Sequence, residues 1–580
     1  MSGEKAIMSG NEAIARGAYE AGVKVAAGYP GTPSTEILEN LVKYKDAGIY
    51  CEWSVNEKVA LEVAAGASLA GVRAMVTMKH VGLNVASDPL MTLSYTGVGA
   101  GLLVVVADDP GMYSSQNEQD TRNYAKFAKI PILEPSDSQE AKEFVKLGLE
   151  ISERFDTPVI LRSSTRVSHS RSVVLLGERV EVVREPDIDP QKYVMIPLHA
   201  RRRRVALEER LEKLKELSNS IECNVLIEGG DELGIIADGV AYQYAAEVFP
   251  EATFLKLGMP YPFPDDLVLK LASKVKRVMV VEELDPFIEE QVRALGIDVI
   301  GKDLIPRVGE LNPDILERVR AKLEGREVEE DRSEPLDLPP RPPVMCPGCP
   351  HRGLFYALSR FKPIVTGDIG CYTLAVLPPL QMMHTCICMG AGISMAHGME
   401  RAGLKKVVGV IGDSTFFHSG MTGLLDIAYN KGRSTIIILD NRTTAMTGHQ
   451  DHPGTGLTLM GEPTAEASPE AIARAYGIKR VRTVDPYDLE GTIKVLEKEL
   501  NADEPSVIVS RRPCILVDRS QIGEPYRVDR EKCRMCKACL KLGCPAIELS
   551  PSDGSIGINP LLCTGCGLCA QVCKFGAIGR

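Results

Sequence analysis

The sequence predicts an α/β chain of several domains with a compact, cysteine-rich domain at its end. Its 580 residues exceed what one hydrophobic core holds, because domains usually contain about 100–200 residues. Short apolar runs alternate with helical segments, which is typical of parallel sheets covered by helices. Eight of the 16 cysteines fall between Cys533 and Cys573. We therefore expect about three to five domains, the last of which binds metal.

The composition is that of a globular protein without a nucleic-acid or membrane partner. Hydrophobic residues make up 44% and charged residues 25%, and the net charge of −11 does not favour nucleic acid. No apolar run reaches the ~18 residues of a membrane span, and the N-terminus has no signal pattern. We therefore expect a cytoplasmic protein. In that reducing compartment, closely spaced cysteines bind metal rather than form disulfides.

The cysteines of the tail form two groups. In each group two residues separate each of the first three cysteines from the next, and a fourth cysteine follows further on. This is the pattern of two-cluster bacterial ferredoxins, in which the fourth ligand of each [4Fe–4S] cluster comes from the other group. Cluster 1 is then bound by Cys533, Cys536, Cys539 and Cys573. Cluster 2 is then bound by Cys544, Cys563, Cys566 and Cys569. Two structural zinc sites are the alternative, but zinc motifs rarely repeat this spacing.

Two apolar runs in the middle of the chain predict neighbouring parallel strands. KKVVGVIGD (405–413) ends in Asp413 and STIIILDN (434–441) ends in Asn441, with a helical segment between them. Ligands bind at the carboxyl ends of such strands, and carboxylate and amide oxygens suit Mg²⁺. The glycines would let backbone amides approach a phosphate. The pattern GDS…DN resembles the thiamine diphosphate motif GDG…NN, with Ser414 and Asp440 as departures; an ordinary strand pair is the alternative.

Glu57 precedes a helix rich in small residues by about one turn. Thiamine enzymes need a glutamate beside N1′ of the aminopyrimidine, because it promotes loss of the proton at C2. Glu57 fits this role by position, and Glu52 and Glu62 are its rivals. The alternative is a solvated residue at a helix N-terminus.

Further motifs resemble the pyruvate and 2-oxoacid:ferredoxin oxidoreductases. GYPGTPSTEI (28–37) is similar to the YPITPS motif of that family, and MCPGCPHRG (345–353) resembles the CPGCGH opening of its diphosphate-binding subunit. KHVGLNVASDP (79–89) and HTCICMGAG (384–392) fit the branch that acts on indolepyruvate, whose large (alpha) subunit has the same domain order. The resemblance covers nearly the whole chain and is weakest over 170–325.

The resemblance implies a fold of two thiamine-diphosphate-binding α/β domains, an intervening transketolase C-terminal-like α/β domain and a C-terminal α+β ferredoxin domain. The expected bounds are 1–170 for the pyrimidine-binding domain, 171–325 for the intervening domain, 344–517 for the diphosphate-binding domain and 518–580 for the ferredoxin domain. The segment 326–343 is charged and proline-rich, which predicts a linker.

The resemblance also implies a reaction. An arylpyruvate such as indolepyruvate loses CO2 with the help of thiamine diphosphate, coenzyme A takes the acyl group, and ferredoxin takes the electrons. Glu57 is the implied activator, and Thr32 lies near the substrate. The implied Mg²⁺ ligands are Asp413, Asn441 and Thr443, and the cofactor lies near Gly412, Ser414, Met389 and Gly390. The implied partner is a smaller gamma-like (beta) subunit in a dimer of heterodimers.

Four further cysteines stand in contexts similar to those that bind a [4Fe–4S] cluster near thiamine in two-subunit relatives. They are Cys346, Cys349, Cys371 and Cys514. Two interpretations stay open, a third cluster or reduced structural thiols, because the sequence does not show that these side chains converge. Cys386 and Cys388 have no assigned role, since free cysteine is often a small buried hydrophobe.

Three alternatives to the predicted function stay open. The same chemistry could act on another 2-oxoacid, such as pyruvate, 2-oxoglutarate or a branched-chain acid. A non-oxidative thiamine enzyme would have no use for two clusters, so the tail argues against it. A non-catalytic electron-transfer subunit is opposed by the intact Glu57, Asp413 and Asn441.

Overall fold

The computed structural model describes residues 4–186, 189–327, 338 and 342–580. The chain forms two compact units, Met1–Pro335 and Leu336–Arg580. Their division falls inside the predicted linker 326–343, most of which (328–337 and 339–341) lies outside the described residues. Within the described ranges, no helix combines the length and the apolar character needed to cross a bilayer.

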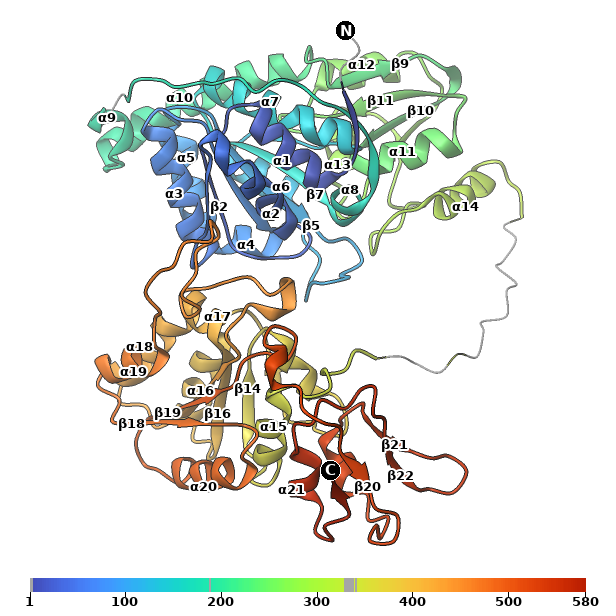
Figure 1. The fold of residues 1–580 in the computed structure, drawn as a ribbon. Coiled ribbons are helices and arrows are strands. Elements are labelled where there is room, and N and C mark those ends of the chain that lie inside the picture. Colours follow the sequence, from blue (N-terminus) through green and yellow to red (C-terminus); the bar gives the residue numbers. More distant parts are fainter. Residues whose placement is uncertain (1–3, 187–188, 328–337, 339–341) are drawn as a thin grey trace. The chain divides into compact units, whose positions relative to one another are not determined.

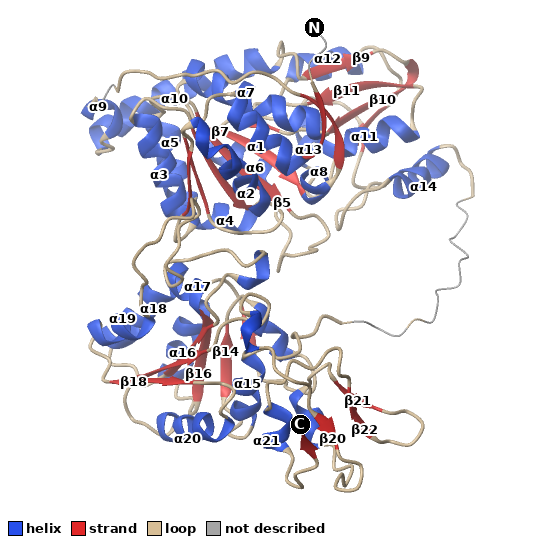
Figure 2. Ribbon diagram, viewed as in Figure 1, coloured by secondary structure: helices blue, strands red, loops and turns tan. Residues whose placement is uncertain are grey.

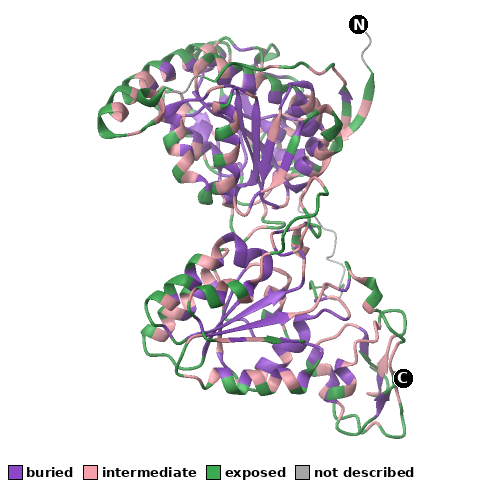
Figure 3. Ribbon diagram, turned by 60° about the vertical axis from the view of Figure 1, so that its left-hand side comes forward, coloured by how far each residue is buried: buried purple, intermediate pink, exposed green. Residues whose placement is uncertain are grey.

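The N-terminal unit contains a six-stranded parallel sheet in the order β3-β2-β4-β5-β7-β6 (Figures 1 and 2). The central strands are apolar runs buried on both faces, as parallel sheets covered by helices require (Figure 3). β5, for example, reads LLVVVAD. The strands are β2 (Val25–Gly28), β3 (Tyr50–Trp53), β4 (Ala74–Lys79), β5 (Leu102–Asp108), β6 (Ile132–Leu133) and β7 (Val159–Ser164).

Helices cover this sheet, and their first residues follow from side-chain caps. Ser9 and Glu12 form a capping box at the start of α1, and the side chain of Asn56 caps α3 by accepting a hydrogen bond from Val59 N. The helices are α1 (Gly10–Glu20), α2 (Thr35–Leu41), α3 (Glu57–Leu69), α4 (His80–Val85), α5 (Ser87–Thr96), α6 (Thr121–Ala128), α7 (Ser138–Phe155) and α8 (Thr165–His169).

The sequence predicts a domain boundary at residue 170, but the segment that follows it still packs against the first domain. β8 (Arg171–Leu175) pairs antiparallel with β1 (Lys5–Ser9). After α9 (Pro190–Tyr193), the long helix α10 (Pro197–Ser218) packs on α5, and Arg203 donates from Nε to the carbonyl oxygen of Tyr95 at 2.7 Å. A strand pairing between residues this far apart leaves no local signal in the sequence.

The second sheet of this unit has the order β13-β12-β10-β11-β9, with β9 antiparallel to β11 and the other pairs parallel. Its strands are β9 (Asn224–Ile227), β10 (Gly230–Asp238), β11 (Ala252–Leu257), β12 (Val278–Val281) and β13 (Val299–Ile300). Its helices are α11 (Gly239–Val248), α12 (Asp265–Ala272), α13 (Phe287–Ala294) and α14 (Pro313–Leu323). Apolar residues of both sheets form one continuous core.

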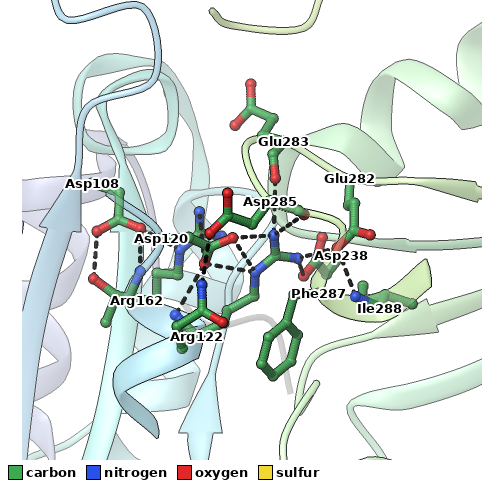
Figure 4. A network of polar contacts seen from close by, with 12 residues as sticks. Asp108, Asp120, Arg122, Arg162, Asp238, Glu282, Glu283, Asp285, Phe287 and Ile288 are labelled. Atoms are coloured by element: carbon green, nitrogen blue, oxygen red, sulfur yellow. Dashed lines mark hydrogen bonds and ion pairs between the residues drawn. The ribbon is translucent and has the colours of Figure 1, made fainter. Parts of the chain in front are cut away.

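A buried ion network joins the two sheets (Figure 4). Arg122 of α6 donates to Asp238 Oδ2 and to Glu282 Oε2, both at 2.8 Å, and these acids lie at the carboxyl ends of β10 and β12. Arg122 is fully buried and also donates from Nε to Asp120 Oδ1 at 2.9 Å. Burial raises the pKa of Glu282 to about 7, and the positive charge of Arg122 opposes this shift.

The C-terminal unit contains a second six-stranded sheet, again parallel throughout, in the order β15-β14-β16-β17-β19-β18. Numbered along the chain, this is the same order as in the first sheet, so the two domains share one topology. Its strands are β14 (Ile364–Gly367), β15 (Thr385–Cys386), β16 (Val407–Gly412), β17 (Thr435–Asp440), β18 (Arg480–Val484) and β19 (Ser506–Arg511). The predicted parallel pair is β16 and β17.

The helix predicted between β16 and β17 begins with an irregular turn. The short α17 (Asp413–Thr415) leads into a π-helical turn at Phe416–Gly420 and then into α18 (Met421–Tyr429). Such π turns occur often at functional sites. The other helices of this domain are α15 (His351–Ser359), α16 (Ala391–Arg401), α19 (Pro469–Ala475) and α20 (Leu489–Leu500).

The last domain is built on short strands and its cysteine loops. β21 (Ile547–Leu549) and β22 (Ile556–Ile558) form an antiparallel hairpin, which includes Gly554 with φ +68°. The remaining elements are β20 (Arg527–Val528), which pairs with β23 (Ile578–Gly579), and α21 (Leu568–Val572). The domain packs on α15 and α20: Arg352 donates from Nη1 to Leu542 O at 2.8 Å, and Leu489 N donates to Gln571 Oε1 at 3.1 Å.

The substitution Arg122→Met should destabilise the N-terminal unit severely. It leaves several buried carboxylates without their cation, and breaking a buried ion pair in this way costs about 3–5 kcal/mol. The free energy of unfolding, measured by urea titration and circular dichroism, should fall by that amount. The matched control is Lys274→Met, which removes an exposed pair with Glu228 and should cost no more than about 1 kcal/mol. Equal losses of unfolding free energy in the two variants would show that the buried ion network does not stabilise the N-terminal unit.

Candidate active site and cysteine centres

Glu57 lies at the carboxyl edge of the first sheet, as the first residue of α3 rather than one turn before it. The helix begins there because Asn56 caps it. The Glu57 side chain is buried, with 6% of its surface exposed. Its carboxyl group packs against Gly82 of α4, where an added Cβ would lie 2.7 Å from Glu57 Oε1. The absence of a side chain at Gly82 therefore makes room for the Glu57 carboxylate.

The two rival glutamates are placed differently. Glu52 accepts hydrogen bonds from the hydroxyls of Tyr50 and Ser54, at 2.9 and 2.6 Å. Glu62 is half exposed and forms an ion pair with Lys58 on the outer face of α3. Of the three, Glu57 alone is both buried and at the carboxyl edge of the sheet.

A lysine that the sequence analysis left without a role lies beside Thr32. Lys79 ends β4 and is buried; its Nζ donates to Ser114 O at 2.7 Å, and the Ser114 hydroxyl donates to Thr32 O at 3.1 Å. Burial lowers the pKa of Lys79 to about 8, and nearby Asp109 opposes the shift. The signal available in the sequence was a lysine directly after the apolar run AMVTM.

The side-chain amide of Asn441 lies between two oxygens at the carboxyl ends of β16 and β17. It is 3.2 Å from Asp413 Oδ1 and 2.9 Å from the carbonyl oxygen of Thr443, and with its nitrogen turned toward them it donates to both. With its oxygen turned toward them, Asn441, Asp413 and Thr443 would present three hard oxygen ligands of the kind that Mg²⁺ prefers. The residues therefore fit the predicted metal.

His452 and Arg511, which the sequence analysis did not single out, hold the two carboxylates of this edge. His452 Nε2 lies 3.2 Å from Asp413 Oδ2, and Arg511 Nε donates to Asp440 Oδ2 at 2.6 Å. Burial opposes the charge on Asp413, but His452 and backbone donors outweigh it and hold the pKa of that carboxyl below its usual value. Burial and the neighbouring Asp413 raise the pKa of Asp440. Asp440, which stands where the usual motif has its first Asn, is thus neutralised by a salt bridge to Arg511.

The glycines of the expected cofactor site lie where close backbone contact occurs. Gly390 has φ +91° and precedes α16, and a Cβ there would lie 2.6 Å from Ser419 Cβ in the π turn. Gly412 N donates to the Tyr372 hydroxyl at 2.9 Å. The Ser414 hydroxyl accepts a hydrogen bond from Thr444 Oγ1 at 2.9 Å, and the half-buried Met389 directly precedes Gly390. All these residues lie at the same edge of the sheet as Asp413.

The cysteines of the last domain surround two separate cavities. One cavity is lined by Cys533, Cys536, Cys539 and Cys573. The other is lined by Cys544, Cys563, Cys566 and Cys569, together with Pro347, Gly348 and Arg352 of the diphosphate-binding domain. These are the two groups that the spacing predicts. No set of three or more His, Cys, Asp or Glu side chains in the described part of the chain is placed to hold a single metal ion.

Cys349 and Cys371, two of the eight cysteines outside the tail, have other thiols as electrostatic neighbours. Burial, together with the nearby thiols of Cys346 and Cys514, raises the pKa of Cys371 to about 11. Burial raises the pKa of Cys349 to about 12, with Cys371 and Cys346 contributing. Cys386 and Cys388 lie near the buried carboxyl group of Asp368.

Fold and site together define a thiamine-dependent oxidoreductase subunit with iron–sulfur centres. Residues 16–208 match the thiamine diphosphate-binding domain of pyruvate flavodoxin/ferredoxin oxidoreductases, 368–510 match the C-terminal TPP-binding domain of thiamine pyrophosphate enzymes, and 556–579 match the 4Fe-4S binding domain.

Curated relatives identify the family. Indolepyruvate oxidoreductase subunit IorA of Pyrococcus horikoshii is 45% identical, over 100% of this chain and 97% of that protein. Subunit IorA of Methanothermobacter thermautotrophicus is 44% identical, over 99% and 97%. The chain therefore belongs to the IorA family. A solved 2-oxoglutarate:ferredoxin oxidoreductase from Magnetococcus marinus aligns over 56% of this chain and 65% of its own, with a TM-score of 0.48 and 17% identity.

The substitution Gly82→Ala should impair 2-oxoacid oxidation without unfolding the domain. The added methyl group occupies the space of the Glu57 carboxylate and displaces it, and a misplacement of about 1 Å can cost roughly 100-fold in rate. Gly66→Ala in α3 is the control, because an added Cβ there meets nothing within 4 Å. It should keep the wild-type kcat. A wild-type kcat for Gly82→Ala would contradict a catalytic role of the Glu57 carboxylate at this position.

Proposed function

We propose that this chain is the large subunit of an enzyme that oxidatively decarboxylates arylpyruvates such as indolepyruvate, with coenzyme A as acyl acceptor and ferredoxin as electron acceptor. The observation that carries the proposal is the contact between a four-cysteine cavity and the CPGC segment of a thiamine-binding domain. A non-oxidative thiamine enzyme has no use for such a contact. The arylpyruvate and the coenzyme A rest on the names and resemblance of the relatives.

The chain's own residues fit the proposed cofactor and substrate. Thiamine diphosphate, when bound, would supply a carbon nucleophile for the keto carbon of the 2-oxoacid and an electron sink for the loss of CO2. Asp413, Asn441 and the Thr443 carbonyl would hold its Mg²⁺, and Glu57 would exchange a proton with the aminopyrimidine N1′. Lys79, a buried cation beside Thr32, would bind the carboxylate of the 2-oxoacid.

A third [4Fe–4S] cluster at Cys346, Cys349, Cys371 and Cys514 is part of the proposal. The thiols of Cys346 and Cys514 contribute to the raised pKa of Cys371, and those of Cys371 and Cys346 to the raised pKa of Cys349, which supports their convergence. Cys514 N donates to Asn441 O at 2.9 Å, so this group adjoins the proposed magnesium site. Gly348 lies between Cys346 and Cys349 and also lines the cavity of cluster 2. The third cluster would therefore stand between the substrate chemistry and cluster 2.

The proposed assembly contains a second, smaller subunit. The family resemblance implies a gamma-like (beta) subunit and a dimer of heterodimers. The 4Fe-4S domain supports transfer of electrons to a ferredoxin, one at a time, since each cubane accepts a single electron.

The test is an anaerobic assay of the chain with its smaller subunit, thiamine diphosphate, Mg²⁺ and coenzyme A. Indolepyruvate should reduce ferredoxin in a reaction that depends on coenzyme A, with a kcat/KM above that for pyruvate, 2-oxoglutarate and branched-chain 2-oxoacids. Glu57→Gln should lower kcat by about 100-fold or more, because it removes the proton exchange at N1′.

The controls separate the alternatives. Glu62→Gln changes an exposed carboxylate on the same helix and should leave kcat unchanged. A preference for another 2-oxoacid would overturn the substrate while keeping the chemistry. A preparation that binds thiamine diphosphate and iron but oxidises no 2-oxoacid would contradict the enzymatic assignment.

A further inference from the structure

The two cysteine loops of the last domain differ sharply in charge. The segment 530–539, which carries three ligands of cluster 1, contains four bases, and a fifth follows Cys573; all five are exposed: Arg530, Lys532, Arg534, Lys537 and Lys574. The segment 559–569, which carries three ligands of cluster 2, contains no charged residue. Because the chain as a whole has a net charge of −11, the positive surface around cluster 1 is a local feature.

Few acids neutralise this surface. Asp529 lies 3.2 Å from the ammonium of Lys532, and both side chains are largely exposed. Glu531 is the other acid of this segment and is also exposed. The bases outnumber these acids, so the field around the first cysteine loop is positive and attracts an anionic partner over about one Debye length, roughly 8 Å at physiological salt.

Exposed apolar side chains adjoin these bases in the chain. Met535 and Phe575 are 53% and 49% exposed, and Cys536 is an exposed cysteine. Arg534, Lys537 and Phe575 also line the cavity formed by the cysteines of cluster 1. Exposed apolar and charged side chains together are typical of a protein interface.

The cavity of cluster 2 has a different neighbour. Gly348 and Arg352 of the diphosphate-binding domain line it, and an added Cβ at Gly348 would lie 2.2 Å from Thr564 Oγ1 of the cluster 2 loop. The cavity of cluster 2 is thus in contact with the diphosphate-binding domain, whereas exposed basic residues border the cavity of cluster 1. Of the two cavities, that of cluster 1 is the one bordered by charged side chains that a partner in solution can reach.

We infer that the surface of Arg530, Lys532, Arg534, Met535, Lys537 and Phe575 is the docking site of a small acidic protein electron carrier, and that cluster 1 is the point of electron exit. The inference rests on the proposed function, which supplies the electrons. Each encounter transfers one electron: cluster 1 is oxidised and the carrier's own iron–sulfur centre is reduced. Charge complementarity selects this occupant and raises its association rate.

Calorimetry on the full chain with its smaller subunit tests the inference without turnover. The probe is an acidic two-cluster ferredoxin, titrated anaerobically at low and high ionic strength, with the iron content of each preparation measured. The variant R530Q/R534Q/K537Q should raise the Kd at least about 10-fold at low salt and flatten its salt dependence. The charge-reversed variant R530E/R534E/K537E should weaken binding further. A folding defect would not produce a loss of affinity that increases stepwise with the change in charge.

The matched control neutralises three exposed lysines of the diphosphate-binding domain, K405Q/K431Q/K479Q, and should leave the Kd within about 2-fold. Equal Kd values for the wild type and both variants would overturn the inference. The inference would also be overturned if the variants changed the sedimentation coefficient of the enzyme but not the Kd for ferredoxin. The surface would then be an interface between copies of this chain or with the smaller subunit.

Failure of the proposed function would look different. Reduction of a viologen dye by the wild type with indolepyruvate, coenzyme A and no ferredoxin reports the upstream chemistry alone. If that reaction is absent, the proposed function fails, while the Kd values still decide whether the basic surface binds an acidic carrier.

Discussion

Parallel pairing of strands is the constraint on which the rest of this structure depends. In each six-stranded sheet every strand runs in the same direction, so the carboxyl ends of all strands meet at one edge. In the first sheet this edge carries Glu57 and Lys79; in the second it carries Asp413 and Asn441. The sheets have the same strand order, and the chain thereby builds two polar edges on one topology. A reversed strand would scatter these residues to opposite ends of the sheet.

The second constraint is the close contact between the cysteine-rich domain and the diphosphate-binding domain. Arg352 is central to it, because its guanidinium donates to Leu542 O in one domain and to Met345 O, at 2.7 Å, beside the CPGC segment of the other. Tyr487 donates its hydroxyl to Gly348 O at the same contact. The bond to Leu542 fixes the segment that leads into Cys544, a ligand of cluster 2, against the diphosphate-binding domain. The basic residues of segment 530–539 stay exposed.

Local patterns in the sequence predicted what depends on local spacing. The four-cysteine groups and the pair β16–β17 follow from periodicity and from motifs within about 40 residues. Features that depend on distant pairing were not predictable: β8 returns to β1, Arg511 reaches Asp440, and His452 reaches Asp413. The sequence shows Lys79 as a lysine at the end of an apolar run. Its burial and its place near Thr32 depend on contacts with Ser114, which is distant in the sequence.

The most direct test of the electron route is an EPR experiment on the complete enzyme after addition of indolepyruvate alone, without ferredoxin. The wild type should show reduced [4Fe–4S] signals from clusters 1 and 2. In the variant Cys371→Ser, which removes a ligand of the proposed third cluster, dithionite should still reduce both clusters but indolepyruvate should not. Equal reduction of clusters 1 and 2 by indolepyruvate in this variant would contradict a route through Cys346, Cys349, Cys371 and Cys514.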